Sequence, residues 1–333
     1  MRGQLREGVR MSLQSTQPVG EFSTRTGLPV IAEPIFVGGV PRSGTTVVGK
    51  RLLGRHHKVA CTIPAEMWFL TNTGGLCDVA AGVDDPRARI RARVNAIRRG
   101  KLTPLGAFEE RMLTFWYERQ WWKDGRAKGL VQSISRDDLT AALSAFRAHY
   151  GDQPVAASRV LAADIIDPSV RKRGKSRWVD TTPANAPRVD ALYRVFPDLK
   201  LIHMVRDGRD VAASTVSRGW GTDEFDQALQ QWRDGMLDNY RAILRIPLGR
   251  AHTVRLEELL GPEGPDHYQA MLNFLGLFDS PKMRSYFITN MNPGAGHVGR
   301  WRKDVRKSDV ARIDRTYERM LESLDRAGVP VPT

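Results

Sequence analysis

The stretch Pro34-Ile35-Phe36-Val37-Gly38-Gly39-Val40-Pro41-Arg42-Ser43-Gly44-Thr45-Thr46 runs from an apolar segment through a glycine-containing turn. Residues 47–53 follow, with apolar side chains at positions 48, 52 and 53. An apolar run bounded by turn residues indicates a buried strand, and the later spacing indicates a helix face. A glycine loop between a strand and a helix is typical of an anion site, because unpaired backbone N–H groups at a helix N-terminus attract negative charge. An ordinary strand–turn–helix corner is the structural alternative.

This loop departs from the nucleoside-triphosphate pattern G-x-x-x-x-G-K-[ST] at one position. Gly39 and Gly44 take the two glycine positions and Thr46 takes the final hydroxyl position, but Thr45 stands where the pattern has lysine. That lysine contacts the terminal phosphates, and no apolar strand ending in a magnesium-binding aspartate is evident. We therefore expect a loop that binds its anion without a metal, with Arg42 supplying the positive charge.

A second strand–helix junction follows later in the chain. The apolar run 199–205 ends at Arg206, and a helix predicted over 210–218 places Ser214 and Arg218 on one face. Two guanidinium groups and a hydroxyl would then surround a second phosphate group. Two anion sites at strand–helix junctions fit a nucleotide with phosphate groups at both ends.

In these segments the chain resembles the sulfotransferases that use 3′-phosphoadenosine 5′-phosphosulfate (PAPS), and within them the tyrosylprotein sulfotransferase branch. Residues 41–46 are similar to the 5′-phosphosulfate loop of that family, and residues 206–218 are similar to its 3′-phosphate motif. Residues 257–277 resemble a late helix of the family, and residues 296–302 resemble the glycine/tryptophan loop that closes over the nucleotide.

The motifs and the resemblance together predict an α/β fold with a P-loop NTPase-like central parallel sheet flanked by helices. The resemblance implies transfer of a sulfuryl group from PAPS to an acceptor hydroxyl, with release of 3′-phosphoadenosine 5′-phosphate (PAP) and without a metal. A nucleotide kinase, a nucleic-acid-binding protein and a non-catalytic nucleotide-binding protein are the alternatives. The residues expected to bind the nucleotide are Arg42, Ser43, Gly44, Thr45, Thr46, Arg206, Ser214, Arg218, Gly299, Arg300 and Trp301.

Two residues are candidates for catalysis. Arg42 is expected to neutralise charge on the departing group, and Glu66 is a candidate general base. Glu66 lies among apolar and aromatic residues, where desolvation would raise its pKa, and it resembles the acidic residue downstream of the donor loop in the family. A carboxylate at a helix start is the structural alternative for Glu66, and His56 and His57 are rival bases. Thr181 stands where related enzymes often carry lysine before Thr-Pro.

The pattern predicts a loosely ordered arm over residues 1–32, followed by a single domain over 33–330. Residues 74–150 are predicted to form a helical insertion on the acceptor side, with helices over 104–122 and 136–149 among others. An apolar stripe in this insertion is more typical of a core than of an acceptor-binding wall. The stripe consists of Phe108, Met112, Phe115, Trp116, Trp121 and Trp122.

The net charge is +14, which fits nucleic acid, an anionic surface or an acidic ligand as partner. Because the charge is spread along the chain, we expect no nucleic-acid partner, and a polyanionic donor accounts for part of the bias. The two cysteines, Cys61 and Cys77, fit neither a zinc pattern nor a disulfide framework. No apolar run of about 18 residues and no apolar signal core are evident. We therefore expect a cytoplasmic protein similar to soluble bacterial-type members of the family.

Overall fold

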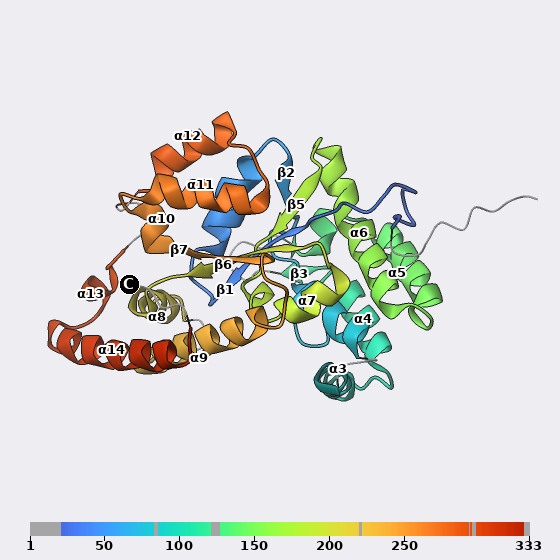
Figure 1. Cartoon of the computed structure of the whole chain (residues 1–333). Helices are drawn as coiled ribbons and strands as arrows, with labels where there is room; N and C mark the ends of the chain where they lie inside the picture. Colours follow the sequence, from blue (N-terminus) through green and yellow to red (C-terminus); the bar gives the residue numbers. More distant parts are fainter. Residues whose placement is uncertain are drawn as a thin grey trace, which may run out of the picture.

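The computed structural model describes residues 21–82, 86–120, 127–219, 222–292, 294 and 298–329. Its centre is a five-stranded parallel sheet in the order β2-β5-β1-β6-β7, with helices around it (Figure 1). The predicted α/β class is therefore confirmed. The strands are β1 (Ile35–Gly39), β2 (Val59–Cys61), β5 (Arg177–Asp180), β6 (Lys200–Val205) and β7 (Ala251–Arg255).

Helices pack on both faces of this sheet. In Figure 1, α10, α11 and α12 lie above it, α5 and α6 lie to the right, and α8, α9 and α14 lie at the lower left. The α-helices are α1 (Trp68–Thr71), α2 (Leu76–Ala81), α3 (Pro86–Arg98), α4 (Pro104–Leu113), α5 (Arg136–Tyr150), α6 (Pro154–Lys172), α7 (Val189–Val195), α8 (Gly208–Val216), α9 (Phe225–Ile243), α10 (Leu256–Leu260), α11 (Gly264–Leu275), α12 (Pro281–Asn290), α13 (Trp301–Asp304) and α14 (Val310–Arg326). Shorter helical segments are η1 (Val47–Leu52), η2 (Leu53–Arg55), η3 (Leu130–Gln132), η4 (Pro183–Asn185) and η5 (Lys307–Asp309).

The central strand β1 shows why helices must cover both faces of the sheet. Ile35 and Val37 point into a core formed with η1, α11 and α12, whereas Phe36 points into a core formed with α6 and α7. The ring of Phe36 packs edge-on against that of Trp178, with centroids 5.3 Å apart. Because successive strand residues face opposite sides, an entirely apolar strand requires a hydrophobic core on each side.

The insertion predicted to be helical over 74–150 contains a hairpin as well as helices. The helix predicted over 104–122 ends at Leu113, so the prediction is wrong for its second half. Beyond this helix, β3 (Arg119–Gln120) pairs with β4 (Ala127–Lys128) in antiparallel fashion. Trp116, between α4 and β3, does not continue the helix. Its backbone N–H donates to the carbonyl of Arg111, and its own carbonyl accepts from the N–H of Leu130. Tertiary packing of a buried aromatic residue thus overrides the helical spacing.

The remaining helix predictions in and after the insertion have different outcomes. The helix predicted over 136–149 is confirmed as α5, and Ser135 Oγ caps it by accepting from the N–H of Asp138 at 3.1 Å. Trp121 and Trp122 lie outside the described residues. Helix α6, of 19 residues, was not predicted.

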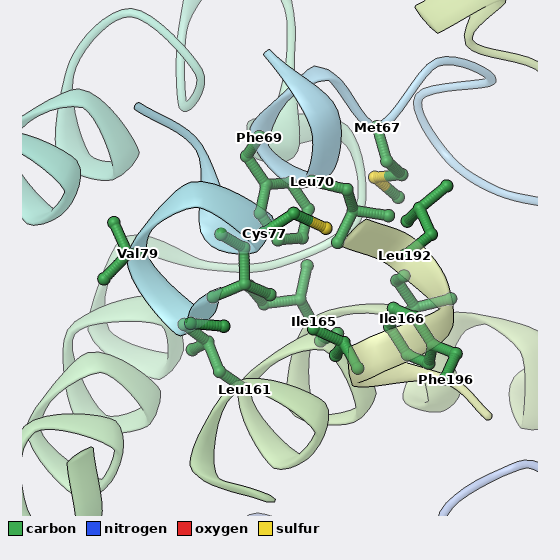
Figure 2. Close-up of a cluster of buried hydrophobic side chains, with 14 of the residues drawn as sticks. Met67, Phe69, Leu70, Cys77, Val79, Leu161, Ile165, Ile166, Leu192 and Phe196 are labelled. Atoms are coloured by element: carbon green, nitrogen blue, oxygen red, sulfur yellow. The ribbon is translucent and has the colours of Figure 1, made fainter. Parts of the chain in front are cut away.

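Helix α6 carries the core beneath the insertion. Figure 2 shows Leu161, Ile165 and Ile166 of α6 gathered with side chains of α1, α2 and α7. Met67, which immediately precedes α1, lies in the same cluster and is 1% exposed. This packing anchors the segment that contains Glu66.

Residues 21–32, the described part of the predicted arm, pack against α6. Ser23 Oγ donates to Asp164 Oδ1 at 2.6 Å, and the N–H of Ile31 donates to Asp167 Oδ2 at 2.8 Å. Residues 1–20 of the arm lie outside the described residues, and the extent of the predicted single domain stays a prediction. In the part of the chain that is described, every helix is too short or too polar to cross a membrane.

Candidate functional site

The glycine loop joins β1 to a helix and has an unusual backbone. Arg42 has φ +78° and Gly44 has φ +97°, so both lie in the left-handed region. This costs little at glycine but strains a residue with a side chain. The first helical hydrogen bond of the following turn runs from the N–H of Val48 to the carbonyl of Gly44 at 3.1 Å. Ser43 Oγ is buried with no hydrogen-bond partner among the described residues, as expected of a donor kept for a ligand.

The two anion motifs meet at Arg42. Its Nε donates to Ser214 Oγ at 2.9 Å, and its carbonyl accepts from Arg206 Nη1 at 3.1 Å. Burial lowers the pKa of Arg42, and repulsion from Arg218 and Arg206 lowers it further. These three guanidinium groups lie close together although they repel one another. A polyanionic ligand would relieve that repulsion, so the cluster fits such a ligand. The structure thus brings together residues that the sequence placed in two separate sites.

Helix α8 presents the second motif, although its boundaries differ from the prediction. It covers Gly208–Val216 instead of 210–218, because Asp207 caps its start by accepting from the N–H of Arg209 at 2.8 Å. Arg218 therefore lies in the turn after the helix, where its N–H donates to Thr215 at 3.2 Å. The turn still leaves Arg218 close enough to act on Arg42.

The C-terminal loop is tethered to the same helix. The N–H groups of Gly299 and Trp301 donate to the two carboxylate oxygens of Asp210, at 2.8 Å and 3.0 Å. Arg206 Nη2 lies 3.8 Å from Asp210 Oδ2, so this carboxylate joins the loop to the arginine cluster. The Trp301 side chain is buried and Arg300 is exposed. Contact of Gly299, Arg300 and Trp301 with a nucleotide stays a prediction.

A cavity of about 340 Å³ adjoins the glycine loop. Thr46 from the loop and Glu66 from the segment before α1 both line it. Phe108, Met112 and Trp116 of the predicted aromatic stripe belong to the core, and Trp116 also lines the cavity together with Phe115. The remaining lining residues are Lys50, Pro64, Ala65, Met67, Trp68, Phe69, Lys128, Gly129, Leu130 and Gln132.

Glu66 is oriented by its neighbours. Its Oε2 accepts from Trp68 Nε1 at 2.7 Å, and the adjacent N–H of Met67 donates to Asp180 Oδ2 at 2.7 Å. Asp180 is fully buried at the end of β5 and also accepts from Asn185 Nδ2 at 2.7 Å. Burial raises the pKa of Asp180, and its hydrogen-bond donors oppose that effect. Since Glu66 precedes a helix of only four residues, a stabilising role at a helix start is the weaker explanation.

The two histidines considered as alternative bases lie away from the cavity. His56 Nε2 is 2.8 Å from the Phe278 carbonyl oxygen, and its Nδ1 accepts from the N–H of Lys58 at 3.1 Å. Neither His56 nor His57 lines the cavity.

Thr181 stands where related enzymes often carry lysine, and it donates to the carbonyl of Ala65 at 2.9 Å. The sequence analysis did not identify Asp180 or Asp210 as residues that position the site. Asp180 is the last residue of β5, and Asp210 lies within the motif of residues 206–218.

Within the described ranges, no three His, Cys, Asp or Glu side chains are grouped to hold a metal ion. The charged groups that converge here are guanidinium groups, which bind anions. Chemistry without a metal stays a prediction, based on the threonine at position 45.

The chain is similar in sequence to known sulfotransferases. A family model described as "Sulfotransferase family" matches residues 34–280. Protein-tyrosine sulfotransferase 2 of Gallus gallus is 26% identical over 252 residues, which are 73% of this chain and 51% of that protein. The chain therefore spans about half the length of this relative.

Two solved structures are similar over most of the chain. The sulfotransferase domain from the curacin biosynthetic pathway is 14% identical, with TM-score 0.49, over 91% of this chain and 100% of that domain. Sulfotransferase STF9 of Mycobacterium avium is 14% identical, with TM-score 0.44, over 90% of this chain and 78% of that protein.

Proposed function

Because the chain belongs to the sulfotransferase family, we propose that it transfers a sulfuryl group from PAPS to an acceptor hydroxyl and releases PAP. The observation that best supports this proposal is the position of Arg42. Its guanidinium hydrogen-bonds Ser214 and interacts electrostatically with Arg206, Arg218 and, with opposite sign, Glu66. The proposed nucleotide site would therefore adjoin the cavity that contains the Glu66 carboxylate.

The donor side of the site consists of hydrogen-bond donors and cations. Arg206, Ser214 and Arg218 would hold the 3′-phosphate, and the backbone N–H groups of residues 43–46 would hold the 5′-phosphosulfate. When bound, PAPS supplies a sulfuryl group on a phosphosulfate anhydride. Arg42 would stabilise the negative charge that grows on the departing phosphate oxygen.

On the acceptor side, Glu66 would accept the proton of the acceptor hydroxyl. A sulfur–oxygen bond forms to the acceptor oxygen while the sulfur–oxygen bond to the phosphate breaks, and the proton passes to the carboxylate. The aromatic walls from Trp68, Phe115 and Trp116 would exclude water from the acceptor. Trp116 Nε1 is buried without a hydrogen-bond partner among the described residues, and it can donate to a polar group of the acceptor.

A direct test uses PAPS labelled in the sulfuryl group with pools of hydroxylated acceptors. We expect label to enter an acceptor in stoichiometric proportion to released PAP. Labelled ATP with Mg²⁺ serves as the kinase control, because lysine is replaced by Thr45 in the loop. Phosphoryl transfer from ATP without sulfuryl transfer from PAPS would establish the kinase alternative. PAP binding with no turnover over any acceptor class would favour a non-catalytic nucleotide-binding protein.

A further inference from the structure

A second cavity, of about 490 Å³, lies between α3, α4, the segment after α1 and the start of α7. It shares no lining residue with the cavity at Glu66. Four arginines line it, which is an unusual concentration of one charge for a cavity. They are Arg98, Arg99, Arg111 and Arg188.

Four buried polar atoms without partners belong to side chains that line this second cavity. Arg111 Nε, Arg188 Nε, Asn95 Nδ2 and Thr71 Oγ1 are all buried, and none has a hydrogen-bond partner among the described residues. All four side chains line the cavity, and Arg111 is only 7% exposed. Buried donors that stay unpaired cost free energy, so such groups on one cavity indicate a bound species.

Nearby carboxylates neutralise only part of the positive charge. Asp78 pairs with Arg188 and is shared with Arg91, whose Nε lies 3.0 Å from it. Arg99 Nη1 lies 3.8 Å from Glu110 Oε2. In the part of the chain that is described, no carboxylate lies within ion-pair distance of Arg98 or Arg111.

Arg111 keeps its charge despite its burial. Desolvation lowers its pKa to about 10, with a further contribution from Arg99, and Glu110 opposes the shift. The guanidinium is therefore protonated at neutral pH and donates from Nη1 to the Thr73 carbonyl at 2.7 Å.

From this arrangement we propose that the second cavity binds an oxyanion, meaning a phosphate, sulfate or carboxylate group. The unpaired groups include two guanidinium nitrogens and an amide nitrogen, which can only donate, and a hydroxyl, which can also donate. Guanidinium groups match the geometry of such anions, whereas a cation or an apolar ligand would leave these donors unpaired.

Arg111 also connects the oxyanion cavity to the cavity at Glu66. Its guanidinium carbon lies 3.9 Å from the centroid of the Trp116 ring, and Trp116 lines the other cavity. An anion bound at Arg111 would therefore hold one wall of the acceptor site. This last step rests on the proposed function, whereas binding of the oxyanion does not. The anion is either a free ion or a group carried by the acceptor, and the two sources can be separated by experiment.

The first measurement is the melting temperature against phosphate concentration at constant ionic strength. It uses the Arg206→Ala/Arg218→Ala background, which removes the proposed 3′-phosphate subsite. Phosphate that still binds at residues 42–46 is common to the two variants compared below, so it cancels between them. We expect a saturable rise. Arg98→Gln removes an exposed arginine of the cavity and should weaken phosphate about tenfold, the equivalent of one charge-assisted hydrogen bond. Arg93→Gln is the matched control, because Arg93 is exposed on the same helix α3 and does not line the cavity.

A second variant keeps the total charge. Arg111→Lys retains a cation but lacks the planar fork, so it should weaken phosphate while the protein stays folded by circular dichroism. A linear, non-saturable response in the background protein would overturn the proposal. So would equal midpoints for Arg98→Gln and Arg93→Gln, because the response would then be a general effect of the salt.

Kinetics in the otherwise unsubstituted protein distinguish the two sources of the oxyanion. If the acceptor supplies it, millimolar phosphate should raise KM for anionic acceptors, and Arg98→Gln should raise that KM about tenfold. If a free ion is the ligand, phosphate should change KM equally for neutral and anionic acceptors. Absence of any turnover would refute the proposed function, and the phosphate titration would still decide the oxyanion site.

Discussion

The buried carboxyl group of Asp167 should make the stability of this protein fall as pH rises from about 4 to about 6. Asp167 is 2% exposed, and its Oδ2 accepts from the N–H of Ile31 at 2.8 Å, whereas its Oδ1 has no hydrogen-bond partner among the described residues. Burial raises the pKa of Asp167 from 3.8 to about 6. Between these values the folded chain binds more protons than the unfolded chain, so rising pH favours unfolding.

The size of this effect follows from the shift. A difference of about 2 pKa units at 1.36 kcal/mol per unit amounts to about 3 kcal/mol, fully expressed above pH 6. Asp167→Asn keeps an acceptor for the Ile31 N–H but does not titrate. Urea unfolding at pH 4, 5, 6 and 7 should therefore show the natural protein losing about 3 kcal/mol relative to the variant.

The comparison is a difference between two proteins, so other titrating groups cancel. His203, for example, is buried with its pKa lowered to about 4, and it titrates equally in both. A constant offset between the two proteins is expected from the amide itself and carries no information. If the difference does not change with pH by more than about 0.5 kcal/mol, the argument from burial is refuted.

Two further predictions concern the site, and a third concerns packing behind the glycine loop. Arg206→Ala and Arg218→Ala should each weaken PAP by about 1.5–3 kcal/mol in calorimetry. Adenosine 5′-phosphosulfate, which lacks the 3′-phosphate, should be nearly unaffected, and equal losses for both ligands would count against the assignment. Glu66→Gln should leave PAP affinity unchanged and lower kcat by about 10²–10⁴. The loss should be smaller with an acidic nitrophenol, and a uniform loss would argue against a base. Gly49→Ala should cost about 1–3 kcal/mol of stability, because an added Cβ would lie 2.3 Å from a methyl carbon of the threonine after β5. Gly54→Ala, whose added Cβ would approach other atoms no closer than 3.5 Å, is the control, and equal costs would contradict the packing argument.

Strands β1 and β6 could be predicted from the sequence because each is a largely apolar run followed by turn residues, as a doubly covered parallel sheet requires. Helix α6 could not, for two physical reasons. It contains Pro168, which normally interrupts a helix, and it buries Asp164 and Asp167, which break its apolar pattern. Both carboxylates accept hydrogen bonds from residues 21–32, a contact between segments far apart in the chain.

The proximity of the loop residues could also be predicted. Arg42, Ser43 and Thr46 belong to one loop, so the pattern itself places them together. Asp180 and Asp210 act through long-range bonds, the first to the N–H of Met67 and the second to the C-terminal loop. A carboxylate within a motif looks like a solvent-exposed charge until its distant partner is known.

The strand order explains why Glu66 and the arginines lie on opposite sides of one loop. In a parallel sheet the carboxyl ends of all strands meet at one edge, where ligands bind. In the order β2-β5-β1-β6-β7, β1 delivers the glycine loop at the centre. The segment after β2 contains Glu66 and is held by Asp180 at the end of β5, whereas Arg206 follows β6 on the other side. The cavity at Glu66 and the arginine cluster therefore flank the loop, and Arg42 is placed to interact with both.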